Sequence, residues 1–260
     1  MLGTRVVVGA VLALLALVVT IHGGLPFFVV ALGVAVIGVN EFYRMMRPYR
    51  PVVLAGLAGV VLMAWAGWTR SPQALMGIVA LSLLASFGLA AVPGPRRGVS
   101  VRIAITMLGL VYVGFGVGHL ELIRRLAEGQ GYALMVVFGT WAGDTVAYFT
   151  GRYFGATPMA PRLSPKKTWE GFVGGFIGTV LMVVFIGLYY HPIGELHSLL
   201  LGVTIGVLAP IGDLFESLLK RDVELKDAGR FFPGHGGLLD RFDGLLFAAV
   251  ASYYLIIVLH

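Results

Sequence analysis

The chain lacks cysteine and is poor in charge. None of its 260 residues is Cys, which excludes disulfide bonds, thiolate metal sites and cysteine nucleophiles. Only 12% of the residues are charged, whereas a soluble domain carries about a quarter. Hydrophobic residues make up 58% of the chain. This composition leaves little room for a separate soluble domain and predicts an all-α polytopic integral membrane protein.

Long apolar runs fill most of the sequence. A helix needs roughly 20 apolar residues to cross a bilayer, or about 17 if its flanks adapt. Nine runs are candidate spans, of which the second and the eighth are short: Arg5–Ile21, Leu25–Val39, Val52–Trp68, Gln73–Val92, Arg102–Gly118, Tyr132–Thr150, Gly171–Tyr190, Leu196–Ile211 and Gly244–Leu259. No small-residue cleavage site follows the first run, so we expect it to be a retained span. The sequence therefore predicts about nine transmembrane helices.

Basic residues divide unevenly between the two sides that nine spans define. Sixteen Lys and Arg residues fall on the side of the N-terminus and three on the other, which accounts for all 19. Because positive charge marks the cytoplasmic face, we expect a cytoplasmic N-terminus, an outside C-terminus and a place in the inner membrane. The net charge of +6 is spread over loops, so lipid heads or nucleotides are better partners than nucleic acid.

The charged residues concentrate in the second of two expected regions. Residues 1–130 hold about five spans, and residues 131–260 hold the others with cytoplasmic loops at 151–170 and 213–243. In the loop at 213–243, 12 of 31 residues are charged, seven acidic and five basic. Charges beside a bilayer are costly unless they are hydrated, paired or bound to something ionic. We interpret this loop as a site for a metal cation and phosphates; a solvated, salt-bridged loop is the alternative.

Three carboxylates lie at the two ends of that loop. Asp213 follows the eighth span, while Asp240 and Asp243 stand three residues apart at the start of the last, where one helix face presents both. Two or three carboxylates without His or Cys favour Mg²⁺, which takes oxygen ligands. The glycines at 236 and 237 allow close backbone approach to phosphate oxygens.

Two further groups fall on the same side. Asp144 lies late in the sixth span, where a carboxylate faces a polar cavity, pairs with a base, binds a metal or makes a structural hydrogen bond. Lys166 and Lys167 follow Pro165, near an expected helix start. A helix N-terminus beside lysine is a natural phosphate site, although a basic membrane anchor is the simpler interpretation of this pattern alone.

These segments resemble a known family. The stretch 217–243, SLLKRDVELKDAGRFFPGHGGLLDRFD, is similar throughout to the signature of the phosphatidate cytidylyltransferases, or CDP-diacylglycerol synthases. Residues 143–145, 151–152 and 164–171 resemble other motifs of that family, in the expected order. Gly244 stands where many relatives carry serine. The motif resemblance covers about residues 143–243, and the first five spans match only in general character.

The resemblance implies an activity. It is the transfer of CMP from CTP to phosphatidic acid at the cytoplasmic leaflet, giving CDP-diacylglycerol and pyrophosphate for phospholipid biosynthesis. It also implies Mg²⁺, a second cation such as K⁺, and a homodimer among membrane lipids.

Roles for individual residues follow from the resemblance together with their chemistry. We expect Asp213 and Asp240 to be the chief metal ligands, assisted by Asp144 and Asp243. Lys220, Arg221 and Lys226 would hold phosphates, and His235 would be a phosphate donor or a loop brace. The full catalytic set is Asp213, Lys220, Arg221, Lys226, Asp227, His235, Asp240, Arg241 and Asp243; the substrate-binding set is Ser164, Lys166, Lys167, Thr168, Asp144, Gly236 and Gly237.

Three alternatives stay open. A CTP-dependent enzyme acting on another lipid, of the CDP-archaeol synthase or polyprenol kinase type, shares much of this chemistry. A transporter would place its ionisable site near the bilayer midplane, often in a broken helix, whereas these charges cluster at one face. A structural scaffold leaves the acid-rich loop unexplained.

Overall fold

The computed structural model describes residues 2–91, 98–190, 194–225, 228–229 and 237–259, and within this part the chain is almost wholly helical. The helices are α1 (Leu2–His22), α2 (Gly24–Met45), α3 (Val53–Trp68), α4 (Pro72–Ala91), α5 (Val99–Gly109), α6 (Gly116–Arg124), α7 (Gly129–Phe154), α8 (Trp169–Tyr189), α9 (Glu195–Asp222) and α10 (Leu239–Leu259). A 3₁₀ turn, η1 (Arg47–Tyr49), follows α2, and a π-helical segment, η2 (Leu110–Phe115), joins α5 to α6.

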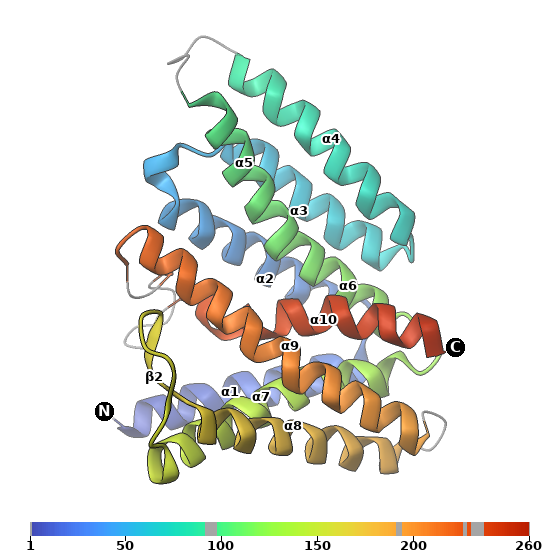
Figure 1. Cartoon of the computed structure of the whole chain (residues 1–260). Coiled ribbons are helices and arrows are strands. Elements are labelled where there is room, and N and C mark those ends of the chain that lie inside the picture. The colour runs from blue at the N-terminus through green and yellow to red at the C-terminus, as the bar shows by residue number, and fades with distance from the viewer. Residues whose placement is uncertain (1, 92–97, 191–193, 226–227, 230–236, 260) are drawn as a thin grey trace.

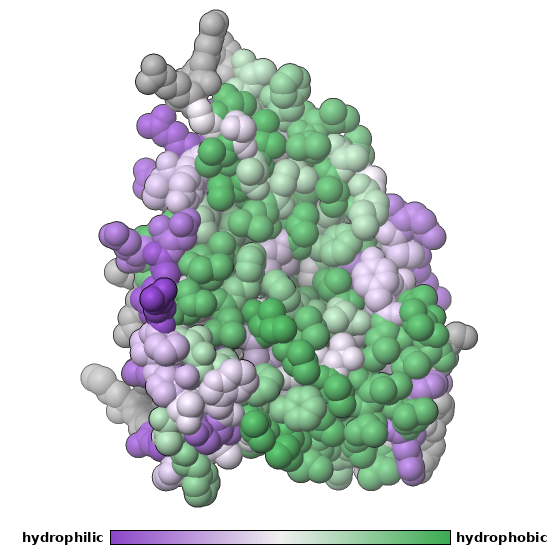
Figure 2. All heavy atoms as spheres, in the orientation of Figure 1, coloured by the Kyte–Doolittle hydropathy of each residue, from purple (hydrophilic) through white to green (hydrophobic). Residues whose placement is uncertain are grey.

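The molecule is an all-α polytopic membrane protein. Within the described residues, six helical segments are long and apolar enough to cross a membrane: Gly24–Met45, Pro72–Ala91, Val99–Arg124, Trp169–Tyr189, Glu195–Asp222 and Leu239–Leu259. Figure 2 shows a broad apolar surface across the middle of the molecule, with hydrophilic residues gathered at two opposite edges. The expected count of nine spans and their orientation stay predictions.

The helices form two groups with α10 between them. In Figure 1, α3, α4 and α5 lie together on one side, while α1, α7, α8 and the first half of α9 lie on the other. Strands β1 (Pro158–Ala160) and β2 (Ser164–Thr168) form an antiparallel hairpin at the end of the bundle where α10 begins. This end, which we call the hairpin end, carries most of the candidate site residues.

Close packing of α7 on α8 depends on glycine. A Cβ added to Gly175 would lie 2.8 Å from the Ala147 Cβ, and one added to Gly178 would lie 2.7 Å from a methyl group of Val146. Helix backbones approach this closely only where side chains are small. Gly175 and Gly178 therefore allow the close packing of α7 on α8.

Two of the predicted spans are shorter than the helices in the structure. Helix α2 continues to Met45, giving 22 residues, and α9 continues to Asp222, giving 28. The last three turns of α9 place Asp213, Glu216 and Lys220 on one helix face. The apolar run has ended here, and contacts of this face with other elements stabilise the end of the helix instead. The stretch from 213 to 222, expected as the start of a loop, is therefore helix.

The segment 151–170, expected to be a loop, also contains regular secondary structure. Helix α7 runs four residues past the expected end at Thr150, to Phe154, and the hairpin fills residues 158–168. The expected helix start near Pro165 occurs at Trp169, where the Thr168 hydroxyl caps α8 by accepting a hydrogen bond from the Gly171 N–H at 3.1 Å. The Ser-Pro pair lies in β2 because the residue before proline disfavours helix.

Candidate active site

The hairpin and α9 meet through one ion pair. The Lys167 Nζ of β2 lies 2.5 Å from the Asp213 Oδ2 of α9, and both side chains are partly exposed. Arg221, two turns further along α9, donates from its Nε to the Leu163 carbonyl at 3.2 Å. These contacts bring the hairpin, which sequence alone leaves unplaced, over the end of α9.

A second lysine joins α9 to α10. The Lys220 Nζ lies 3.0 Å from Glu216 Oε2 and 2.8 Å from Asp240 Oδ1. Glu216 is fully buried, and Lys220 and Asp240 keep only a small exposed fraction. A buried carboxylate needs a compensating charge, so Lys220 has an electrostatic role in holding these two helices together.

Asp240 also braces the chain that leads into α10. Its carboxylate accepts hydrogen bonds from the Gly237 N–H at 2.7 Å and from the Ala228 N–H at 3.1 Å. With Lys220 this makes three donors on one carboxylate. Asp240 therefore fixes both described edges of the loop whose central residues, 230–236, lie outside the described part.

A group of carboxylates lies next to these pairs. Asp213 is within electrostatic range of both Asp144 and Asp243, and Asp243 is close enough to Glu216 for their carboxyl groups to interact directly. Asp243 is 9% exposed, and the buried Glu216 Oε1 has no hydrogen-bond partner among the described residues. Such crowded acids repel one another when ionised, unless a cation lies among them or one of them holds a proton.

The oxygen-only donor set therefore fits Mg²⁺ in chemical type. Among the described residues, however, no three Asp, Glu or His side chains are arranged closely enough to hold a metal ion. Lys167 and Lys220 form ion pairs with two of the carboxylates, Asp213 and Asp240. The metal-ligand roles of Asp213, Asp240, Asp144 and Asp243 stay predictions.

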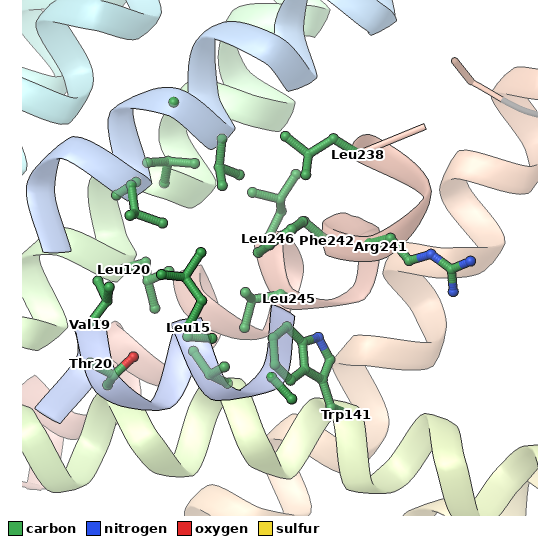
Figure 3. A pocket seen from close by; sticks show the side chains of 18 of the residues that line it. Leu15, Val19, Thr20, Leu120, Trp141, Leu238, Arg241, Phe242, Leu245 and Leu246 are labelled. Atoms are coloured by element: carbon green, nitrogen blue, oxygen red, sulfur yellow. The ribbon is translucent and has the colours of Figure 1, made fainter. Parts of the chain in front are cut away.

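An apolar cavity opens beside the charged groups. Its volume is about 840 Å³, and its walls come chiefly from α1, α2, α7 and α10. Figure 3 shows Trp141 of α7 and Leu245 of α10 at its apolar wall, while the guanidinium of Arg241 points away from it. Asp144, Thr145 and Asp240 also line the cavity, so one region combines apolar walls with carboxylates.

The predicted site residues divide into three sets. The structure brings together Asp144, Lys167, Asp213, Lys220, Asp240 and Asp243, with Arg241, Arg221 and Gly237 next to them. Ser164, Lys166 and Thr168 belong to the hairpin, where Lys166 is exposed and Thr168 caps α8. Lys226, Asp227, His235 and Gly236 lie outside the described residues.

Sequence reasoning missed three residues near this site. Glu41 of α2 accepts a hydrogen bond from the Leu239 N–H at 2.8 Å. Tyr112 packs edge-on against Phe215, and its buried hydroxyl has no partner among the described residues although the Asp243 and Glu216 carboxylates are near. It stands on the π-helical segment η2, an irregularity frequent at functional sites. The third residue is Trp141, which could be recognised only from the cavity that it lines. Glu41 could have been noticed in the sequence as an acidic residue beside an apolar run.

Comparison with known proteins shows which family this chain belongs to. The model of the cytidylyltransferase family matches residues 3–259. The chain belongs to the cytidylyltransferase family. A phosphatidate cytidylyltransferase of Bacillus subtilis is 32% identical over 97% of this chain and 96% of its own length. Another, of Staphylococcus epidermidis, is 33% identical over 92% of this chain and 93% of its own.

A shorter match is more similar. A phosphatidate cytidylyltransferase of Thermotoga maritima is 42% identical over 160 residues, which is 58% of this chain and 58% of the relative. The resemblance seen in the motifs thus extends, in the cytidylyltransferase family, to nearly the whole chain. Family membership also fits a site in which basic and acidic side chains meet without a cysteine nucleophile.

Proposed function

We propose that this protein transfers CMP from CTP to phosphatidic acid, giving CDP-diacylglycerol and pyrophosphate. The observation that carries the proposal is the position of the Lys167–Asp213 and Lys220–Asp240 pairs beside an apolar cavity of about 840 Å³. A lipid phosphate needs both environments at once, because its acyl chains avoid water while its head group and the nucleotide carry negative charge. Family membership supports the same reaction.

The reaction needs no protein nucleophile. A phosphate oxygen of the lipid attacks the α-phosphorus of CTP, the bond from that phosphorus to the bridging oxygen breaks, and pyrophosphate leaves with the electron pair. The protein has to bring two polyanions together and offset the charge that develops, so positioning and electrostatics suffice. Lys167 and Lys220, which form ion pairs with Asp213 and Asp240, are the groups that we assign to the phosphates.

We propose Mg²⁺ as the cofactor, with a second cation such as K⁺ beside it. Asp144, Asp213 and Asp243 would hold it, with Asp240 supporting the loop or joining them. When bound, the ion would neutralise the triphosphate and stabilise the leaving pyrophosphate. The mutual repulsion of the carboxylates and the unpartnered Glu216 Oε1 support a cation here.

The setting of the site is part of the proposal. Nine spans, a cytoplasmic hairpin end, an outside C-terminus and a place in the inner membrane agree with the sixteen basic residues on one side. CTP is a cytoplasmic nucleotide, so the charged edge has to face the cytoplasm. The homodimer that the family resemblance implies also stays a prediction.

An assay with purified protein tests the function. Protein in detergent micelles is given CTP and phosphatidic acid, and CDP-lipid and pyrophosphate are followed with Mg²⁺ and K⁺ present and after chelation of Mg²⁺. We expect equal amounts of both products, and loss of both on chelation. If a folded protein forms neither product from phosphatidic acid but both from an ether-linked lipid phosphate, the substrate assignment is wrong; product that survives chelation would contradict the cofactor.

A further inference from the structure

Helix α2 contributes a buried acid to a region formed otherwise by α9 and α10. Glu41 is 6% exposed, although it lies about 200 residues before the catalytic stretch in sequence. A carboxylate taken out of water costs free energy unless hydrogen bonds or charges compensate it. Its contacts therefore show what the residue does.

The first contact is with the start of α10. The Leu239 N–H donates to Glu41 Oε2 at 2.8 Å, and Leu239 is the first residue of that helix. The N–H groups in the first turn have no partner within their own helix. A carboxylate at this end satisfies one of them and interacts favourably with the helix dipole. Glu41 thus fixes the chain one residue before Asp240.

The second contact is with two glycines of the loop. A Cβ added to Gly237 would lie 2.6 Å from Glu41 Oε2, and one added to Gly229 would overlap Glu41 Oε1. All three atoms nearest to that added Gly229 Cβ belong to Glu41. The backbone therefore lies directly against the carboxylate at both described edges of the 230–236 segment.

Two carboxylates consequently contact the same described edges of the loop. Asp240 accepts from the Ala228 and Gly237 N–H groups, while Glu41 contacts Gly229, Gly237 and Leu239. We propose that Glu41 is a positioning residue that sets the described edges of this loop, at 228–229 and 237–238, and the start of α10, and so places Asp240 and Lys220 for the reaction. This inference rests on the proposed function.

The expected effect is on turnover. Glu41 contacts the backbone at Gly229, Gly237 and Leu239, so losing it should move Asp240 without removing a group that binds CTP. A misplacement of about 1 Å costs on the order of 100-fold in rate. We expect Glu41→Ala to lower kcat by about 10- to 100-fold with the KM for CTP changed less than about threefold. Glu41→Gln, whose amide oxygen still accepts from Leu239, should retain more activity.

The control and the second perturbation use other residues of the chain. Glu195 is an exposed acid in the first turn of α9, so Glu195→Gln changes an acid at a helix start that touches no part of the site. Gly229→Ala introduces a methyl group that must push the Glu41 carboxylate aside. It should reproduce the kcat loss of Glu41→Ala, and it decides the matter if Glu41→Ala does not fold.

Hydrogen exchange of the Ala228, Gly237 and Leu239 amides separates this inference from the proposed function. Faster exchange of these amides in Glu41→Ala, together with the kcat loss, supports the positioning role. Wild-type exchange and wild-type kcat in both Glu41→Ala and Gly229→Ala overturn it. Should the wild-type protein itself make no CDP-lipid, the proposed function fails, and exchange still shows whether Glu41 holds the loop.

Discussion

Two helix pairs of this bundle, α3 with α4 and α9 with α10, are both largely apolar but differ in their charged residues. Neither α3 nor α4 contains an acidic or basic residue, and their buried polar groups are hydroxyls such as those of Ser82 and Ser86. In contrast, α9 and α10 place Asp213, Lys220 and Asp240 at one end. Of these two pairs, only α9 with α10 carries charge, and α10 also lines the cavity.

The difference teaches how a membrane bundle carries a reaction site. Helix α9 as a whole is long and apolar enough to span a membrane, and only its last turns carry the paired charges, so these charges are kept near one edge. The α3–α4 pair supplies packing alone. Four substitutions, taken in order of expected effect, test this division.

The largest effect should come from Asp240→Asn. The amide loses the negative charge that faces Lys220 and one of the two oxygens that accept backbone N–H groups. We expect activity to fall by about 100- to 1,000-fold, as on losing a preorganised electrostatic group. CDP-lipid formation measures this, and the melting temperature shows that the variant is folded. Activity above a tenth of wild type would remove Asp240 from the site.

A smaller but still large loss is expected for Lys167→Ala. The change leaves the Asp213 carboxylate without its partner at 2.5 Å and takes a cation from the phosphates. We expect about 100-fold lower kcat/KM. Lys166→Ala, on the adjacent and exposed residue of β2, is the matched comparison and should cost less than about tenfold. Equal losses for the two lysines would mean that general positive charge, not the ion pair, matters.

The cavity is tested by Gly33→Leu. Gly33 lines the cavity, and a Cβ added to it would meet no atom within 4 Å. A leucine side chain at this position would therefore occupy cavity volume that we assign to the lipid. We expect the KM for phosphatidic acid to rise about tenfold with the KM for CTP unchanged. Gly77→Leu is the control, because Gly77 of α4 is equally unobstructed and lies away from the cavity. The lipid-cavity assignment fails if both variants behave alike.

The smallest effect belongs to the α3–α4 pair. Ser86 is fully buried, and its hydroxyl has no hydrogen-bond partner within the described part of the chain. Ser86→Ala removes this unsatisfied group, so the free energy of unfolding should stay equal or rise by up to about 1 kcal/mol. Activity should stay within about twofold of wild type. Loss of turnover at constant stability would show that α4 takes part in the reaction.

Much of this architecture follows from local pattern. Apolar runs locate the helices, and the acids around 213 and 240 indicate where chemistry occurs. Each of these signals lies within a short window of the chain. The predicted ends of α2 and α9 came too early because the apolar runs end before the helices do. Tertiary contacts stabilise the remaining turns.

The pairing of charges could not be predicted from sequence. Lys220 has several acids within reach of its helix end, and the choice of Glu216 and Asp240 depends on how α9 crosses α10. The role of Glu41 depends on the approach of α2 to Leu239 across 198 positions. The cavity, likewise, exists only because α1, α2, α7 and α10 converge on one space.

The most direct test of the account follows phosphorus from CTP into lipid. Purified protein receives phosphatidic acid, Mg²⁺ and CTP labelled either at the α-phosphate or at the γ-phosphate. The account predicts that the α-label enters the lipid, that the γ-label leaves in pyrophosphate, and that Asp240→Asn transfers neither. Transfer of the γ-label to a lipid would instead identify a kinase and contradict the proposed reaction.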